Sequence, residues 1–180
     1  MERRNKLTKE IVDPPFIHSR EEVEAFFKSM RAIWDVSDTC KQLRSILFSM
    51  ETPFEISKIV GFACSSMAYN HQEYDRTHRA AYQHALILTL QDELGKKQSN
   101  SHHIRCFAQD PAYTPIDKLV LESHNITVLN DPKGFLEVDD STVVISCAAD
   151  VPVKEIISDL ARPAIMIWNR ISEDEPKYML

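Results

Sequence analysis

The feature that most constrains this chain is the alternation of short apolar runs with helical patterns between residues 58 and 168. Short apolar runs bounded by turn residues are typical of strands buried on both faces of a parallel sheet, and such strands need crossover helices. We predict strands at 58–64, 104–109, 126–129, 142–147 and 164–168, with helices at 76–94, 115–124 and 152–161. The pattern predicts an α/β, Rossmann-like three-layer sandwich with a mostly parallel five-stranded sheet.

Two further helices are predicted before the first strand. Ser19 and Glu22 have the spacing of a capping box, so we expect a helix over about residues 20–34. Its apolar stripe consists of Val23, Phe26, Phe27, Met30, Ile33 and Trp34. A second helix is expected over about 38–50, ending before Pro53. The two helices should form an N-terminal layer packed on the core, and their aromatic side chains, if uncovered, would mark a surface for a protein partner or a homodimer.

The chain has the length of one ordinary domain, at 180 residues. We expect a leader and two helices in 1–54, a Rossmann-like domain in 55–171 and an acidic tail in 172–180. The best-marked helix start lies inside that domain. Thr114 can cap the helix, Pro115 occupies its first position, and the carboxylate of Asp117 faces its positive end.

Charge and glycine content exclude several classes of function. Lys and Arg number 21 against 27 Asp and Glu, and the net charge of −6 provides no overall positive field to attract nucleic acid or anionic lipid. The three glycines, Gly61, Gly95 and Gly134, are too far apart to form GxGxxG, GxxxxGK or GxSxG. A Walker loop and a nucleophile elbow are therefore excluded, and the usual dinucleotide fingerprint is absent.

The cysteine and histidine patterns indicate a compartment and give no metal site. The four cysteines form no CxxC pair, so we expect free thiols in a reducing environment. The N-terminus leads into no apolar signal region, and no run of about 18 apolar residues occurs, so a soluble cytoplasmic or nuclear protein is expected. The seven histidines form neither HExxH nor a deaminase motif. His84 lies in an apolar helix and should be a buried histidine with satisfied hydrogen bonds.

The predicted sheet brings several loops to one edge. Parallel strands end at the same edge, and doubly wound folds bind ligands there, where the strand order reverses. Seven residues lie at or just after the ends of the first four predicted strands: Cys64, Ser65, Ser66, Asp110, Asp131, Cys147 and Asp150. We predict that they line a cleft for a small metabolite or a nucleotide.

Several of these residues have a second role open to them. Asp110 can accept hydrogen bonds from both hydroxyls of a ribose, or its Asp-Pro dipeptide can open a turn, which is the commoner role. Ser65 and Ser66 can bind an anion or cap the following segment. Cys64 and Cys147 can form a soft-metal, haem or redox site, although buried cysteine is more often a small core residue.

The segment 106–130 resembles the sensitivity-to-red-light-reduced (SRR1-like) domain family. In that family a strand ending in Asp-Pro, here Asp110-Pro111, is followed by an aromatic or aliphatic residue, a helix with a Val-Leu pair and a short strand. Residues 83–90 are similar to the family's Gln-Leu helix, and residues 168–170 align with its Gly-Asn-Ser-Phe ending. The likeness covers about residues 55–171.

The resemblance implies a Rossmann-like domain without an established reaction, associated with phytochrome signalling and clock output in plants, cytoskeletal and stress phenotypes in fungi, and haem metabolism in animals. The family's Pro-His-Cys motif after the fourth strand is replaced here by Ser146-Cys-Ala-Ala-Asp. No nucleophile with its base can be assembled from the sequence, so catalytic residues and cofactor stay unassigned. We hypothesise an SRR1-like regulatory or binding protein; the alternative is an adenosylmethionine-dependent methyltransferase-like enzyme, with Asp110 on the ribose and residues 64–66 beside the methionine moiety.

Overall fold

A five-stranded parallel sheet forms the centre of the computed structural model, which describes residues 18–51, 55–69, 74–98, 103–147 and 149–169. The strands are β1 (Lys58–Phe62), β2 (Arg105–Gln109), β3 (Ile126–Val128), β4 (Thr142–Ser146) and β5 (Ile165–Trp168). Their order is β3-β2-β1-β4-β5, and each neighbouring pair is parallel. The predicted Rossmann-like α/β fold is confirmed.

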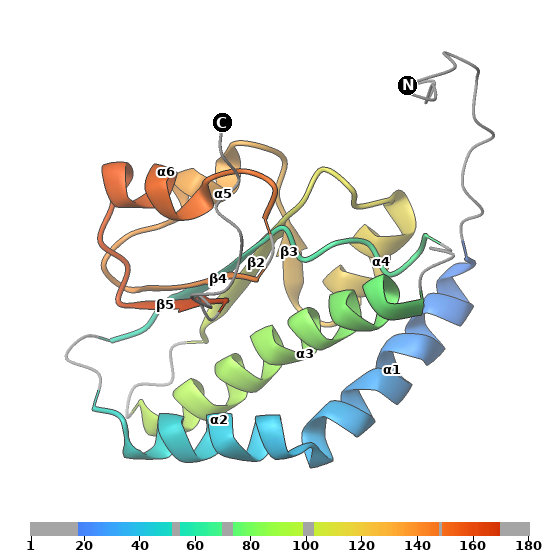
Figure 1. Ribbon diagram of the computed structural model, residues 1–180, viewed down its shortest axis with the longest axis horizontal. Helices are drawn as coiled ribbons and strands as arrows, with labels where there is room; N and C mark the ends of the chain where they lie inside the picture. The colour runs from blue at the N-terminus through green and yellow to red at the C-terminus, as the bar shows by residue number, and fades with distance from the viewer. Residues whose placement is uncertain (1–17, 52–54, 70–73, 99–102, 148, 170–180) are drawn as a thin grey trace, which may run out of the picture.

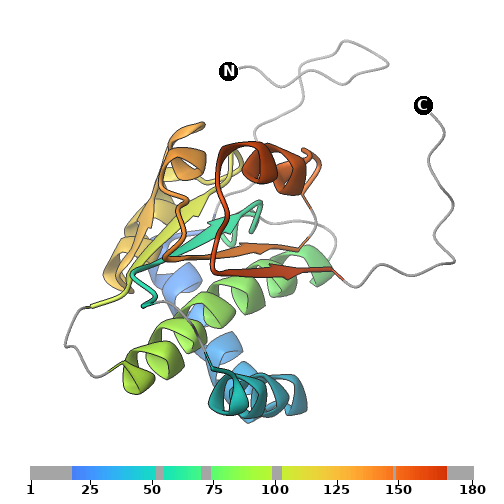
Figure 2. The same ribbon diagram turned by 90° about the vertical axis from the view of Figure 1, so that its left-hand side faces the viewer.

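Helices cover both faces of the sheet (Figures 1 and 2). They are α1 (Arg20–Val36), α2 (Asp38–Ser49), α3 (Tyr74–Lys97), α4 (Pro115–Ser123), α5 (Lys133–Leu136) and α6 (Val153–Leu160). The helices α3 and α4 lie on one face, over the larger core cluster, and α5 and α6 lie on the other. Because α1 and α2 pack on the outer side of α3, α3 is covered on two sides, which explains why its sequence is apolar on more than one face.

Apolar and polar contacts join the N-terminal helices to α3 and α4. The helix α1 begins with the expected capping box, and Phe27 is fully buried. The indole Nε1 of Trp34 donates to Thr89 Oγ1 over 2.9 Å, and Glu24 lies 3.0 Å from Nε2 of His124. The aromatic rings of α1 therefore pack against the core and do not form an exposed aromatic surface.

One residue of the apolar stripe predicted for α1 is not buried. Ile33 was expected on the buried side of α1, but it is 48% exposed. The helix buries Val23, Phe27 and Met30, and the 3.6-residue period rotates Ile33 away from the side that these residues define. A spacing of three or four along the chain therefore overstates the width of the buried face.

Each predicted strand and helix is present, with ends that shift by a few residues. The strand β1 ends at Phe62 because Ala63 and Ser65 adopt φ values of 55° and 64°, which turn the chain out of the sheet. The helix α5 was not predicted, since its four residues are too short to show a period. No helix within the described ranges is long and apolar enough to cross a membrane.

Candidate functional site

The three central strands end side by side at one edge of the sheet. Phe62, Gln109 and Ser146, the last residues of β1, β2 and β4, share one register. The strand order reverses between β1 and β4, so this edge carries the position at which doubly wound folds bind ligands. The loop after β1, here called the β1 loop (described over residues 63–69), meets the loop from β2 into α4 at this edge.

Asp117 is the buried centre of this edge. Its Oδ2 accepts hydrogen bonds from the Ser66 hydroxyl over 2.6 Å and from both the backbone N–H and the hydroxyl of Thr114 over 2.8 Å. Its Oδ1 accepts from the backbone N–H groups of Met67 and Ala68, over 2.8 and 3.1 Å. Asp117 is fully buried, and it fixes the β1 loop against the first turn of α4.

The predicted cap at Thr114 is confirmed, but the Asp117 carboxylate also bonds residues much farther along the chain than the sequence indicated. Thr114 and Asp117 form a capping box, and the same carboxylate also holds residues about 50 positions earlier in the chain. Ser66 is fully buried, and its Oγ accepts from the N–H groups of Ala68 and Tyr69 while it donates to Asp117. Ser66 is thereby committed to bonds within the protein.

Asp110 holds the same loop at a second point. Its Oδ2 accepts the Ser65 backbone N–H over 2.7 Å, and its Oδ1 accepts the Ala112 backbone N–H over 2.8 Å. The second bond is the turn-forming contact expected of an Asp-Pro dipeptide. Each carboxylate oxygen has a second lone pair, so these two bonds leave acceptor capacity on Asp110. The structure thus brings Ser65 and Asp110 into direct contact.

Gln109 links β2 to the segment that contains Asp131. Its Nε2 donates to Asp131 Oδ1 over 2.9 Å, and its Oε1 accepts the Gly134 backbone N–H over 2.6 Å. The ring of Phe135 stacks on Phe62, with centroids 4.6 Å apart. Nothing in the sequence singled out Gln109 as a linking residue, because a polar residue at a strand end can have many roles.

A buried polar chain lies beneath the β1 loop. The carbonyl of Ala80 only accepts, so His84 Nδ1 carries the hydrogen and donates to it over 2.6 Å, while Nε2 accepts from the Tyr113 hydroxyl over 2.7 Å. Burial lowers the pKa of His84 to about 4. Burial also raises the pKa of Tyr113 well above its usual value, as does the neighbouring Cys64. His84 is the satisfied, buried histidine that the sequence suggested.

The remaining predicted residues differ in exposure. Cys64 is fully buried, and burial, followed by the charges of Asp110 and Cys147, raises the pKa of its thiol far above the usual value. Cys147 is partly buried and has its pKa raised by burial. Asp131 and Asp150 are exposed. Both thiols are protonated at neutral pH and poorly suited to nucleophilic chemistry.

Among the described residues, no group of three or more His, Cys, Asp or Glu side chains could hold a metal ion. The backbone N–H groups of the β1 loop are also committed. In nucleotide-binding folds this loop presents its N–H groups to phosphate, whereas here Ser65, Met67 and Ala68 donate to protein carboxylates. The loop after β1 is therefore a self-satisfied hydrogen-bond network rather than a preformed phosphate cradle. The buried Ser146 hydroxyl, at the end of β4, has no hydrogen-bond partner among the described residues.

These observations define a doubly wound, parallel α/β protein of 3-2-1-4-5 strand order with a polar strand-end edge. A model of the SRR1 domain matches residues 39–179, which is most of the chain. The chain belongs to the SRR1 domain family, and the resemblance of its sequence is confirmed. The match begins within α2, so α1 lies before it. Searches of curated proteins and of solved structures gave no significant match.

Proposed function

We propose that this SRR1-family chain is a regulatory or binding protein, acting in signalling, clock or stress regulation in the cytoplasm, the nucleus or both. Its ligand, a small metabolite or a segment of a protein partner, would bind in a cleft at the carboxyl edge of the sheet. Of the seven predicted site residues, Ser65, Asp110, Asp131, Cys147 and Asp150 would contact the ligand. Cys64 and Ser66, which are fully buried, would lie beneath the rim and support the loop after β1. We also propose that residues 55–171 form the Rossmann-like domain, with 1–54 as a helical layer and 172–180 as a tail.

The observation that carries the proposal is the commitment of the β1 loop to Asp110 and Asp117. A phosphate group needs free N–H donors, and it would meet carboxylates at Asp110 and Asp131 instead. A ligand without phosphate, recognised through side chains of the rim, fits these groups better. The absence of an activated nucleophile among the two described thiols at this edge favours binding over catalysis.

One observation favours a second candidate, the methyltransferase-like enzyme. Asp110 follows β2 and touches the loop after β1, which is where an acidic residue holds a ribose in this fold class. The lone pairs that remain on its carboxylate could accept ribose hydroxyls. Against this reading, Ser65 stands with φ 64° where close backbone approach to a cofactor favours glycine.

Thermal unfolding separates the two candidates. The full chain is heated with adenosylmethionine, adenosylhomocysteine, NAD, ATP and haem, each at about 100 times a plausible dissociation constant. A bound ligand should then stabilise by roughly 2.7 kcal/mol and raise Tm by about 5 to 10 °C. We expect NAD and ATP to leave Tm unchanged, because the β1 loop offers them few free donors.

The variant Asp110→Ala and its control Asp140→Ala, an exposed acid near the start of β4, complete the test. A shift with adenosylhomocysteine that disappears in Asp110→Ala and persists in Asp140→Ala would overturn the binding-protein proposal in favour of the enzyme. A shift with NAD or ATP would contradict the argument from the β1 loop. Silence across the whole panel would support a protein partner as the ligand.

A homodimer or partner contact through the N-terminal helices also stays a proposal. The aromatic residues of α1 are covered, so such a contact would have to use the exposed apolar residues of α1 and α2. These are Ile33, Val36, Ile46 and Phe48. Sedimentation of the wild-type chain beside Phe48→Ser, which replaces a side chain that is 85% exposed, would test the idea. An unchanged monomer in both samples would exclude the homodimer.

A further inference from the structure

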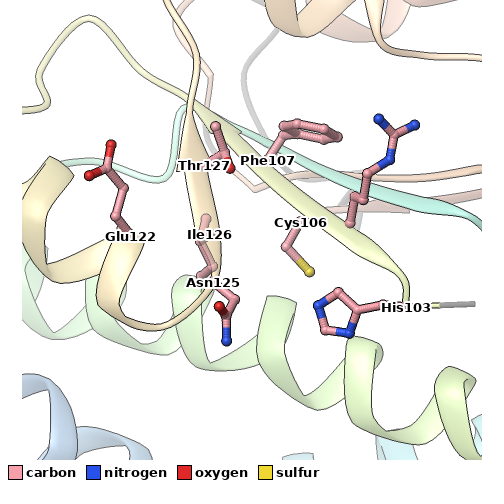
Figure 3. Close-up of a pocket in the computed structure, with 8 residues that line it drawn as sticks. His103, Cys106, Phe107, Glu122, Asn125, Ile126 and Thr127 are labelled. Atoms are coloured by element: carbon pink, nitrogen blue, oxygen red, sulfur yellow. The ribbon is translucent and has the colours of Figure 1, made fainter.

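The opposite edge of the sheet contains a second polar site, which the fold rule for doubly wound proteins does not address. A hollow of about 280 Å³ opens where β2 and β3 begin (Figure 3). We call it the β2–β3 hollow; it is lined by His103, Arg105, Cys106, Phe107, Glu122, Asn125, Ile126 and Thr127. Its volume lies just below the usual range for ligand pockets, so it would take a small molecule.

Arg105 is the cationic group of the β2–β3 hollow. Its guanidinium carbon lies 5.6 Å from the centroid of the Phe107 ring, a distance at which the ring face attracts the cation and restrains it. Arg105 is exposed and makes no ion pair with any carboxylate in the described part of the chain. A guanidinium held against a ring and left without a counter-ion can offer two parallel N–H groups to a carboxylate.

Further donors surround the same hollow. The side-chain nitrogen of Gln91 lies 2.7 Å from the Ile104 carbonyl and 3.3 Å from His103 Nε2. Since an amide nitrogen donates, His103 Nε2 accepts, and its Nδ1 keeps a hydrogen for another partner. Asn125, in the left-handed conformation at φ 60°, and Thr127 make no side-chain hydrogen bond within the described ranges.

Glu122 limits the charge that the hollow can accept. Its side chain lies on the other side of Thr127 from the β2 residues, and it too makes no ion pair in the described part of the chain (Figure 3). One carboxylate and one guanidinium leave little net positive charge, so a dianion would be repelled by Glu122 more than a monoanion would. Cys106, Phe107 and Ile126 in the floor of the hollow are 2%, 9% and 0% exposed, so the polar rim supplies most of the contacts to a ligand.

We propose that the β2–β3 hollow binds a small monocarboxylate, with its carboxylate on the guanidinium of Arg105. This site is separate from the strand-end cleft and does not depend on the function proposed for it. The arrangement selects a carboxylate over a phosphate monoester, which carries close to two charges at neutral pH.

Titration of the isotopically labelled full chain with sodium benzoate, phenyl phosphate and benzamide tests the site. We expect benzoate to shift the backbone amide resonances of Ile126 and Thr127 saturably, at a Kd at least tenfold below those of phenyl phosphate and benzamide. Equal binding of benzoate and the neutral benzamide would overturn the proposal, since charge would then play no part. The Kd for benzoate should be about 1 mM or lower, which corresponds to −4.1 kcal/mol or tighter binding. The absence of a shift in these resonances at benzoate concentrations up to about ten times that Kd would also overturn the proposal.

Two variants and a control assign the effect to residues. Arg105→Met keeps an apolar side chain on Phe107, and it should weaken benzoate binding at least tenfold. Arg162→Met, at an exposed arginine that hydrogen-bonds the Ser158 and Ala161 carbonyls, should leave benzoate binding unchanged. Glu122→Gln should strengthen the binding of phenyl phosphate more than the binding of benzoate. Loss of binding in Arg162→Met, or unchanged binding in Arg105→Met, would overturn the assignment.

Discussion

The polar side chains at the two edges of the sheet differ in how far they hydrogen-bond to other parts of the protein. At the carboxyl edge, Asp117 and Asp110 together accept seven hydrogen bonds, all from groups of this chain. At the β2–β3 hollow, Arg105, Glu122 and Asn125 make no side-chain hydrogen bond or ion pair with other described residues. At the edge where the fold class usually binds ligands, the two carboxylates bond within the protein, although the buried Ser146 hydroxyl there has no partner among the described residues. The other edge holds exposed groups that are free to bind.

The contrast separates two kinds of evidence for a site. Strand order places a ligand at the carboxyl edge by analogy with other folds. Polar groups without a partner in the protein can bind a ligand by their own chemistry. Here the buried Ser146 hydroxyl lies at the carboxyl edge, and the exposed Arg105, Glu122 and Asn125 lie at the opposite edge. Stability should therefore depend strongly on the polar residues of the carboxyl edge and weakly on those of the β2–β3 hollow, and four predictions test this difference.

Asp117→Ala should have the largest effect. It leaves the buried hydroxyl and N–H donors of Ser66, Met67 and Thr114 without their acceptor, and we expect a loss of about 4 kcal/mol or more in the free energy of unfolding. Urea denaturation followed by circular dichroism measures it. The control Asp159→Ala, at an exposed site on α6, should cost under about 0.5 kcal/mol. A loss below about 1 kcal/mol for Asp117→Ala would contradict the network.

The pH dependence of stability should reveal His84. Burial lowers its native pKa to about 4, whereas in the unfolded chain it is about 6.5. Between these values the unfolded chain binds the extra proton, so stability is fully present above pH 6.5 and falls by about 3 kcal/mol as pH decreases to 4.

Denaturation curves at several pH values test this prediction. The slope between pH 4 and 6.5 should flatten in His84→Phe and persist in His103→Gln, because His103 is exposed. The same slope in His84→Phe and in the wild type would show that other groups are responsible.

Gly134→Ala should have an intermediate effect at the carboxyl edge. A Cβ there would lie 2.7 Å from Gln109 Oε1 and 3.0 Å from Phe62 Cε1, and Gln109 is held in place by Asp131. We expect a loss of about 1 to 3 kcal/mol in unfolding experiments. Gly95→Ala, in α3 with nothing within 4 Å, should instead stabilise by about 0.5 to 1 kcal/mol. Two variants of equal stability would show that Gln109 moves freely.

Substitutions in the β2–β3 hollow should have the smallest effect. Arg105→Met and Glu122→Gln remove exposed groups that make no hydrogen bond or ion pair with other described residues, and methionine keeps an apolar contact with Phe107. Each should therefore change the free energy of unfolding by less than about 0.5 kcal/mol. Thermal and urea unfolding of both variants measure this. A loss of more than about 1 kcal/mol in either would mean that its group has a structural partner, and the contrast between the edges would disappear.

Sequence reasoning was strongest where the signal is local. The capping box at Ser19 and the helix start at Thr114 were predicted from residue type and spacing, since the groups that bond there are three residues apart. The alternation of apolar runs likewise gave the element order and the α/β class. Periodicity did not predict α5, which is too short to show a period. It also placed Ile33 in the core, whereas this residue is exposed on α1.

By itself, the sequence of this protein determined the parallel α/β fold, the helix starts and the family, because periodicity, caps and motifs are written in neighbouring residues. Only the tertiary structure decided that Asp117 would hold Met67, 50 positions away, and that Arg105 would be left without a carboxylate. Such pairings depend on distances in space, which the crossover connections set and which no short stretch of the chain encodes.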